Sequence, residues 1–168
     1  MIDFDIKEAT LLDVALINSL AKETFSATYS PILSPDQVEY MFEMMYSFEN
    51  IEKQMASGHN YFIAYLDSVP CGYVSIRKKD ENYFYIEKIY TIPKVHGSGV
   101  GKELFEFACN YATLSSKNEK ALLELNVNRY NARAISFYKK MGMHPDRQTD
   151  EHVGNGYYAN DYVMAIEL

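Results

Sequence analysis

Residues 83–114 read YFYIEKIYTIPKVHGSGVGKELFEFACNYATL. The segment begins with β-branched and aromatic residues, which favour a strand, and it ends with apolar residues at helical spacing. The loop Val95–Lys102 lies between them, and Gly97, Gly99 and Gly101 occupy alternate positions in it. Glycines let a backbone approach a ligand without a Cβ in the way, and the free N–H groups of a helix N-terminus favour phosphate. The order of strand, glycine loop and helix predicts an anion-binding loop rather than an empty turn.

Two common phosphate-binding loops do not match this spacing. A P-loop places Ser or Thr directly after the Gly-Lys pair, whereas Gly101-Lys102 is followed by Glu103. A dinucleotide fingerprint needs G-x-G-x-x-G, and the glycines here leave one residue too few in the second gap. The loop therefore belongs to another class of anion site.

A second segment of interest follows a predicted strand at residues 121–127. Residues 128–142 read NRYNARAISFYKKMG. Asn131 has the side chain of a helix cap, and Tyr138 follows two turns later with a phenol that needs a partner if it is buried. Taken alone, the apolar residues of this segment are equally explained as core.

The whole chain alternates between helical and strand patterns. We expect mixed α/β structure, with a largely antiparallel first half and a βαβ unit in the second half. A Ser34-Pro35 start predicts a helix after residue 34, and Thr10 predicts one after residue 10. The expected strands cover residues 2–7, 60–66, 71–77, 83–92, 121–127 and 161–168. The helix after Thr10 is expected to cover 11–25, and the other expected helices cover 48–57, 102–114 and 131–141. Residues 67–70, 78–82 and 93–101 are expected to be turns or loops.

Length and composition set outer limits on what the protein is. With 168 residues, 48% apolar and 23% charged, the chain fits one globular domain over residues 1–168. No window is apolar enough for a membrane span, and the first twenty residues lack the basic start of a secretory signal. We therefore expect a cytoplasmic protein without a membrane partner, in which Cys71 and Cys109 are reduced thiols.

The charges are unevenly spread along the chain. Residues 1–60 hold ten acidic and three basic side chains, which accounts for the whole net charge of −7. Residues 87–140 hold nine basic and five acidic side chains. An acidic balance argues against a nucleic-acid partner, and it is compatible with a cationic substrate near the N-terminal third and an anionic cofactor in the middle. The alternative is that the acids only keep the protein soluble.

Together the two segments resemble the Gcn5-related N-acetyltransferase (GNAT) superfamily. The family's pyrophosphate loop, [Gln/Arg]-x-x-Gly-x-[Gly/Ala], has its counterpart in His96–Gly101, and the preceding Ile89–Pro93 resembles the family's L-Y-V-x-P strand. The family's N-x-x-A-x-x-x-Y-x-K-x-G pattern is matched from Asn131 to Gly142. His96 departs from the usual Arg or Gln, and Met143 stands where Phe is common.

The resemblance implies a central, twisted, mostly antiparallel sheet of about six to seven strands with about four helices, and acetyl-CoA as co-substrate. It assigns the protonation of the leaving thiolate to Tyr138 and a hydrogen bond with the pantetheine arm to Asn131. An amine would attack directly in a ternary complex, with a backbone N–H near Tyr90 as oxyanion donor. The implied coenzyme site comprises Ile89, Tyr90, Thr91, His96, Gly97, Ser98, Gly99, Val100, Gly101, Lys102, Asn131 and Lys140.

We assign the general base that takes the proton of the amine from the alternation of side chains along the expected strand 83–92. Alternation over residues 83–92 puts Glu87 on the face of Tyr85, Ile89 and Thr91, where a carboxylate suits a direct or water-mediated base. The alternative for Glu87 is an ion pair with a neighbouring strand. The histidines and cysteines have no zinc spacing, so no metal is expected.

The acceptor is assigned by a further likeness to PaiA-type polyamine N-acetyltransferases. It rests on Glu23–Phe25 with Thr28, on YIEKIY at residues 85–90 and on FYKKMG at residues 137–142. This likeness implies a small cationic amine such as spermidine or spermine, with Glu23 and Tyr29 as residues that meet it. Two alternative functions stay open: a protein N-terminal or lysine acetyltransferase, and an idle acetyl-CoA-binding regulatory module. A homodimer also stays open.

Overall fold

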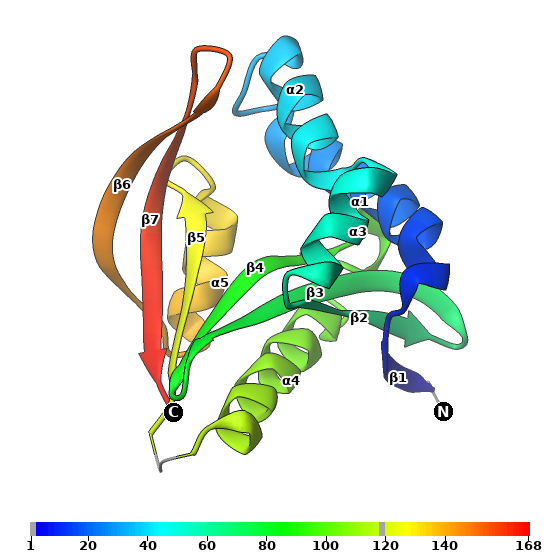
Figure 1. The fold of residues 1–168 in the computed structure, drawn as a ribbon, viewed down its shortest axis with the longest axis vertical. Helices are drawn as coiled ribbons and strands as arrows, with labels where there is room; N and C mark the ends of the chain where they lie inside the picture. Colours follow the sequence, from blue (N-terminus) through cyan, green and yellow to red (C-terminus); the bar gives the residue numbers. More distant parts are fainter. Residues whose placement is uncertain (1–2, 118–119) are drawn as a thin grey trace.

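The computed structural model describes residues 3–117 and 120–168 and contains one seven-stranded sheet with helices on both faces (Figure 1). The strand order is β1-β2-β3-β4-β5-β7-β6, and only the β4–β5 pair is parallel. This confirms the expected mixed α/β class and the βαβ unit around α4. The strands are β1 Phe4–Glu8, β2 His59–Leu66, β3 Val69–Asp80, β4 Tyr83–Thr91, β5 Leu122–Asn128, β6 His144–Gly154 and β7 Tyr157–Glu167.

Five α-helices are present in the described part of the chain, as the residue patterns predict, whereas the resemblance implied about four. They are α1 Val14–Tyr29, α2 Pro35–Tyr46, α3 Phe48–Ala56, α4 Val100–Ser115 and α5 Ala132–Lys140, and the short 3₁₀ helices are η1 Leu11–Asp13 and η2 Pro93–Val95. None of these helices is long and apolar enough to cross a membrane.

The predicted helix starts are confirmed by their caps. Ser34 Oγ accepts a hydrogen bond of 3.2 Å from the Gln37 N–H, with Pro35 at the first helical position. Thr10 and Asp13 form a reciprocal capping box at η1. Both arrangements satisfy N–H groups that a helix start would otherwise leave unpaired.

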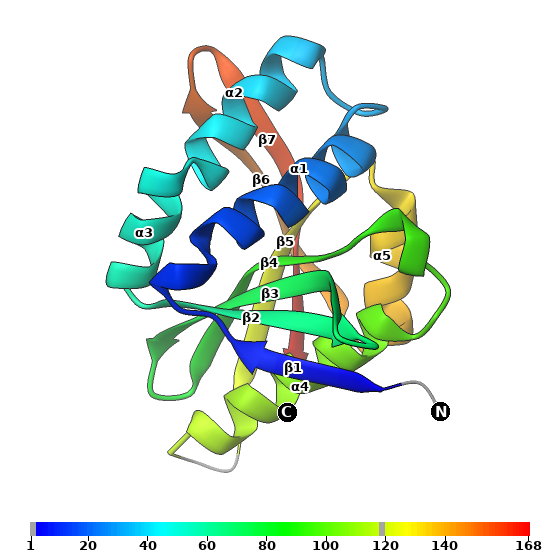
Figure 2. The same cartoon turned by 90° about the vertical axis from the view of Figure 1, so that its right-hand side faces the viewer.

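The two faces of the sheet are covered by different helices. Tyr61 and Phe62 are neighbours on β2, so their side chains point to opposite faces. Phe62 packs on Phe107 of α4 with ring centroids 4.8 Å apart. On the other face, Tyr73 donates a 2.8 Å hydrogen bond to Tyr46 at the end of α2. Figure 2 shows α1, α2 and α3 on that second face.

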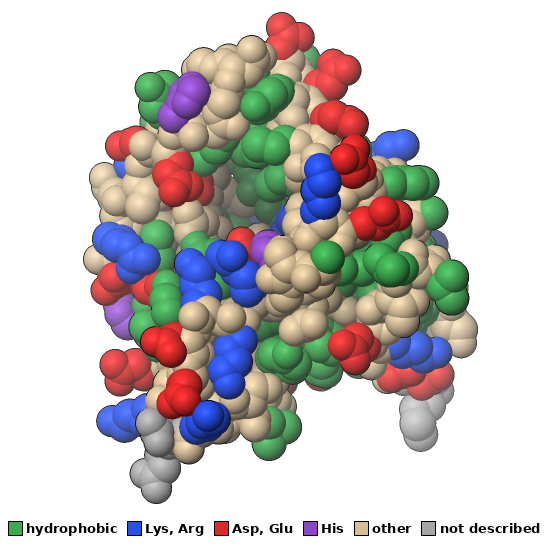
Figure 3. Space-filling model, viewed as in Figure 1, with side chains coloured by type: hydrophobic (Ala, Val, Ile, Leu, Met, Phe, Trp, Pro, Cys, Tyr) green, Lys and Arg blue, Asp and Glu red, His purple; other side chains and the backbone are tan. Residues whose placement is uncertain are grey.

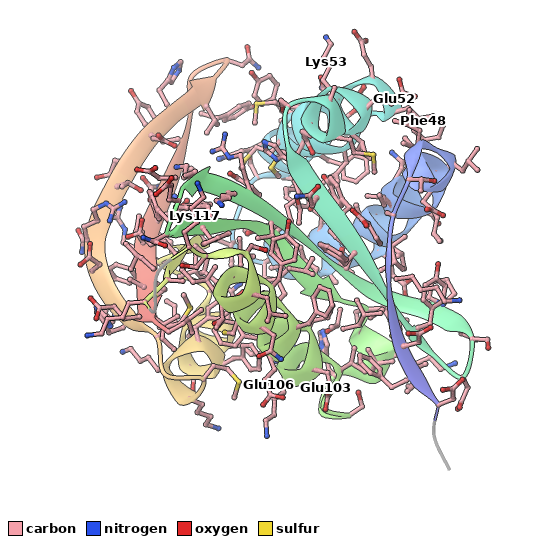
Figure 4. All side chains as sticks on the ribbon, turned by 60° about the horizontal axis from the view of Figure 1, so that its bottom comes forward. Phe48, Glu52, Lys53, Glu103, Glu106 and Lys117 are labelled. Carbon is pink, nitrogen blue, oxygen red and sulfur yellow. The ribbon has the colours of Figure 1, made fainter. Side chains whose placement is uncertain are left out.

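Helix α4 turns its charged side chains away from the sheet. Leu104 and Ala108 are fully buried, whereas Glu103 and Glu106 point outward (Figure 4). This is the polarity that a helix covering one sheet face requires.

Several expected boundaries differ from the structure. Strand β6 was not predicted, because HPDRQTDEHVG is exposed along nearly its whole length and has no apolar alternation. Helix α1 starts three residues later and ends four residues later than the expected 11–25. The expected turn at 78–82 is largely part of β3, and the chain turns at residues 81–82. In the expected strand 2–7, residue 2 lies outside the described residues.

Candidate active site

The site begins where two parallel strands separate. Pairing between β4 and β5 runs from Tyr83↔Leu122 to Ile86↔Leu125 and then ends. Beyond that point, the last residues of both strands border a cavity of about 530 Å³. The strands therefore leave backbone groups of β4 unpaired on the β5 side, inside a space large enough for a ligand.

The walls of this cavity come from α1, the end of β4, the glycine loop, β5 and α5. Most of the predicted site residues meet there, but Glu23, Glu87, Ser98, Val100 and Lys140 do not line it. The lining is Thr24, Ala27, Thr28, Tyr29, Ile89, Tyr90, Thr91, Pro93, Val95, His96, Gly97, Gly99, Gly101, Lys102, Asn126, Val127, Asn131, Arg133, Ala134, Phe137 and Tyr138.

The glycine loop has the backbone of an anion site. Gly97 and Gly99 have φ of 82° and 94°, which L-residues with side chains rarely adopt. Within the described residues, the first main-chain bond of α4 runs from the Glu103 N–H to the Gly99 carbonyl at 3.0 Å. The N–H groups of Gly101 and Lys102 have no acceptor among those residues, so they and the helix dipole are available to a phosphate.

His96 has a structural role that the sequence did not indicate. Arg133 of α5 donates from Nη1 to His96 Nδ1 at 2.5 Å, and His96 Nε2 lies 3.2 Å from the Thr91 carbonyl. Because arginine only donates, the imidazole accepts at Nδ1 and donates at Nε2. His96 thereby holds Arg133 beside the glycine loop, where its cation lines the cavity.

Three further predicted coenzyme residues lie in helices or directly before one. Asn131 caps α5, its Oδ1 accepting from the Ala134 N–H at 3.2 Å, and it also lines the cavity. Lys102 lines the cavity while its Nζ lies 3.7 Å from Glu106 on the exposed surface of α4. Lys140 is exposed in the last turn of α5, away from the lining residues.

Tyr138 is buried, with 8% of its surface exposed, and its ring packs against Phe105 and Phe137. No group in the described part of the chain forms a hydrogen bond with its hydroxyl. Burial raises the pKa of this phenol, and the nearby Tyr29 raises it further. The hydroxyl is therefore protonated at neutral pH and free to donate to a ligand in the cavity.

The α1 wall of the cavity is lined by neutral hydroxyl groups. The Tyr29 and Tyr90 hydroxyls are 3.0 Å apart, and Thr24 Oγ1 lies 3.3 Å from the buried Tyr73 hydroxyl. Burial raises the pKa of Tyr29 and Tyr90. This wall offers hydrogen bonds without a charge of its own. Glu23, one residue before Thr24, points into solvent.

The expected position of Glu87 needs correction. A register shift pairs Ser75 with Lys88 and Ile76 with Ile86, so Glu87 is the extra residue of a β-bulge. The bulge breaks the alternation and puts Ile89 on the opposite face from Tyr85. Glu87 forms an ion pair of 2.9 Å with Arg77 on β3, which is the alternative that the sequence left open.

Four polar residues of the lining were not predicted as site residues: Thr24, Thr28, Asn126 and Arg133. A signal for the threonines exists, because Ile17 and Ala21 form an apolar stripe on α1 that Thr24 and Thr28 continue at helical spacing. A polar continuation of a buried stripe indicates a wall that faces a polar ligand. Asn126 and Arg133 carry no such signal.

Within residues 3–117 and 120–168, no group of three His, Cys, Asp or Glu side chains is placed to hold a metal ion.

Comparisons with known proteins identify the family. The model of the acetyltransferase (GNAT) family matches residues 18–143, which is most of the chain. The chain therefore belongs to the GNAT family and is an acetyl-CoA-dependent N-acetyltransferase. It is 27% identical over 150 residues to an uncharacterized N-acetyltransferase of Lactobacillus delbrueckii subsp. lactis, a match that covers 79% of this chain and 85% of that protein.

Solved structures share the fold at low sequence identity. PaiA N-acetyltransferase from Thermoplasma acidophilum, in complex with coenzyme A, is 21% identical with a TM-score of 0.80 and 99% of each chain covered. Naa50 of Arabidopsis thaliana, in complex with the bisubstrate analogue CoA-Ac-MVNAL, is 19% identical with a TM-score of 0.72, covering 98% of this chain and 99% of that one. Both likenesses concern the fold.

Proposed function

We propose that this N-acetyltransferase acetylates a small polyamine, with spermidine first. The observation that carries the proposal is the separation of charge across the cavity. Lys102 and Arg133 border it at the glycine loop. Asp161 of β7 is not a lining residue, but its carboxylate accepts a hydrogen bond from Asn126, which lines the cavity, and its charge raises the pKa of Tyr29, another lining residue. The anionic coenzyme and the cationic acceptor would thus each lie near protein charges of the opposite sign.

Asp161 is suited to hold an ammonium group. It is half-buried, and its carboxylate accepts a 3.1 Å hydrogen bond from Asn126 Nδ2. Burial raises the pKa of this carboxyl, and the neighbouring Glu151 and Asp150 act in the same direction, while Asn126 and Arg129 lower it. A partly desolvated carboxylate gains more from an approaching cation than a surface carboxylate does.

The coenzyme would occupy the glycine-loop side. The N–H groups of Gly101 and Lys102, which have no acceptor among the described residues, would bind its pyrophosphate, with the Lys102 and Arg133 side chains as cationic partners. Asn131 uses its amide to orient the pantetheine arm. The unpaired backbone at Ile89–Thr91 receives the thioester, and one N–H there stabilises the oxyanion.

The reaction follows from these positions. The neutral amine attacks the thioester carbonyl carbon, and the C–S bond breaks as the amide forms. Tyr138 donates its proton to the leaving sulfur. The proton lost by the amine passes to a carboxylate, for which we place Asp161 first, because it bonds to a cavity residue. Glu87 stays a prediction as a water-mediated base.

The rival acceptors are a protein N-terminus and a lysine side chain. The PaiA likeness supports the polyamine, and the Naa50 likeness, whose analogue carries the peptide MVNAL, supports the rival. Neither likeness decides between them, because both are below one-quarter identity. The charge separation favours the polyamine.

A panel of acceptors tests the proposal. Spermidine, spermine, diamines, amino acids and Ser- or Ala-initiated peptides are compared by kcat/KM at saturating acetyl-CoA. We expect spermidine to lead and its KM to rise with salt, since salt screens charge attraction beyond ~8 Å. If neutral peptides exceed spermidine in kcat/KM by about tenfold or more, the polyamine proposal is wrong and protein acetylation takes its place.

A pair of variants tests the role of Asp161 directly. We expect Asp161→Asn to lower kcat/KM for spermidine by about tenfold or more, which corresponds to losing about 1.4 kcal/mol, and to leave the affinity for acetyl-CoA unchanged. Glu52→Gln removes the same charge from an exposed side chain of α3 (Figure 4) and serves as the control. Equal effects of the two substitutions would remove Asp161 from acceptor binding.

A further inference from the structure

Strand β1 forms one edge of the sheet, and its outer side is open. In the strand order β1 has one neighbour, β2. Figure 1 shows β1 at the outer right of the molecule, and no described helix covers it in Figure 2, where that side faces the viewer. An uncovered edge strand presents a row of unpaired N–H and C=O groups, to which a further strand can add.

The hydrogen bonds with β2 show which residues of β1 point outward. Before the strand, the Asp3 carbonyl accepts from the Asp67 N–H at 2.7 Å. After it, the Ala9 N–H donates to the Tyr61 carbonyl at 2.8 Å. In an antiparallel ladder, residues bonded to one neighbour alternate with residues whose groups face the other way, so the odd-numbered residues bond to β2. The residues that direct N–H and C=O groups to the open edge are Phe4, Ile6 and Glu8.

The charges beside Ile6 favour one register for pairing with a second copy of the chain. Asp5 and Lys7 flank Ile6, and their side chains are 55% and 66% exposed. In an antiparallel pair centred on Ile6, two-fold symmetry puts Asp5 of each copy directly opposite Lys7 of the other, and opposite charges in that position attract. A pair centred one residue earlier puts Asp5 opposite Asp5, and a pair centred one residue later puts Lys7 opposite Lys7. Like charges directly opposite are destabilising, so the strand selects the Ile6 register over its two neighbours.

The same register satisfies the backbone of the open edge. Ile6 would form a hydrogen-bonded pair with its symmetry mate, and Phe4 would form one with Glu8 of the other copy. Asp5 and Lys7 then fall at non-hydrogen-bonded positions, where side chains approach most closely and the Cα atoms are ~4.5 Å apart. Within one chain, Lys7 Nζ lies 3.8 Å from Asp5, but an ion pair between exposed side chains is weak. Both side chains are therefore available to a partner.

We propose that β1 pairs with β1 of a second copy, antiparallel about a two-fold axis at Ile6, so that the two sheets become one. Figure 3 shows acidic and basic side chains together over β1, at the lower right of the view, as a self-complementary edge requires. The strand has five residues, fewer than the ~20–30 a side of a stable interface, so the dimer is weak, with a dissociation constant on the order of 10–100 µM. None of the five described residues of β1 lines the cavity, and the pairing does not depend on which amine is acetylated.

Charge reversal tests the interface and its register. Sedimentation equilibrium should show the wild type dimerising between about 1 µM and 1 mM. Asp5→Lys puts lysine opposite lysine and Lys7→Asp puts aspartate opposite aspartate, so each variant alone should dimerise at least about tenfold more weakly. Mixed together, the two variants should form a heterodimer, because every pair is again of opposite sign. The double variant Asp5→Lys/Lys7→Asp should regain wild-type dimerisation. Glu52→Lys changes the net charge as Asp5→Lys does, at an exposed site on α3 (Figure 4), and should leave dimerisation unchanged.

A cysteine on the proposed axis tests the geometry. Ile6→Cys puts two cysteines in a hydrogen-bonded pair with Cα atoms ~5.5 Å apart, within the ~4.4–6.8 Å that a disulfide spans. Oxidation should therefore join two chains of this variant. Phe4→Cys should not join to itself, because its partner position is Glu8. The wild type, in which Cys71 is buried and Cys109 half-buried, gives the background.

Three results would overturn the proposal. One is a wild type that stays monomeric at about 1 mM. Another is a wild-type dimer that Asp5→Lys and Lys7→Asp leave as strong as before, which would place the interface elsewhere. The third is a wild-type dimer whose two single variants do not combine with each other, or whose Ile6→Cys variant does not cross-link.

Discussion

Replacing Tyr138 by Phe removes one oxygen atom and keeps the ring that packs against Phe105 and Phe137. Because the hydroxyl has no hydrogen-bond partner among the described residues, its loss leaves no protein group unsatisfied. We expect the free energy of unfolding to change by less than about 1 kcal/mol. The acetyl-CoA affinity should also stay close to that of the wild type.

The effect on turnover should be far larger. A general acid is typically worth ~10²–10⁴ in rate, which corresponds to about 3–5 kcal/mol of activation free energy. Burial raises the pKa of Tyr138 above its ordinary value of 10.0, so the acid form persists throughout neutral pH. Loss of its proton should therefore not limit kcat below about pH 10 in the wild type.

The assay is thiol release from acetyl-CoA with spermidine, combined with calorimetry of acetyl-CoA binding and urea unfolding for the same preparations. A large loss of kcat with unchanged binding and stability supports proton donation. Wild-type kcat in a folded Tyr138→Phe variant would refute it. A loss of acetyl-CoA affinity equal to the loss of activity would assign Tyr138 to binding instead.

Three further substitutions have definite expected outcomes. Gly99→Asp puts a strained, negatively charged residue at the glycine loop, and calorimetry should show acetyl-CoA binding about 100-fold weaker or worse. Unchanged affinity in a folded variant would show that acetyl-CoA does not bind at this loop. Arg133→Ala should raise KM for acetyl-CoA several-fold with little change in kcat, and equal changes in both constants would count against a binding role. Burial lowers the pKa of Lys88 to about 7, although the nearby Glu87 acts in the opposite direction. Above pH 7 the unfolded chain therefore binds more protons than the folded protein does. The free energy of unfolding should rise between pH 7 and 10 by up to about 1.4 kcal/mol per pH unit. In Lys88→Met, urea unfolding at pH 7 and 9 should lack this rise, and an unchanged pH dependence would place its origin elsewhere.

Parts of the site were predictable because local chemistry determines them. Alternate glycines between a strand and a helix indicate an anion loop, and the structure has positive φ at Gly97 and Gly99 there. Ser34-Pro35 determines the start of α2 through its own hydrogen bonds. In both cases the residues that allow the prediction are the same residues whose backbone or hydrogen bonds form the loop or the helix start.

Other parts depend on contacts between distant segments. The bulge at Glu87 follows from the register with β3, and the alternation within β4 gives no sign of it. The position of Arg133 depends on His96, a residue on another element. Strand β6 has a polar exposed surface, and the signal that marks its hairpin is the pair Asn155-Gly156, which favours a type I′ turn.

The most direct test of the account follows the acetyl group itself. Acetyl-CoA labelled in the acetyl group is incubated with the protein and spermidine, and labelled acetylspermidine and free thiol are counted together. We expect the two products to appear in equal amounts and Tyr138→Phe to suppress both. Tight acetyl-CoA binding without transfer of label to spermidine or to any other amine of the panel would contradict it.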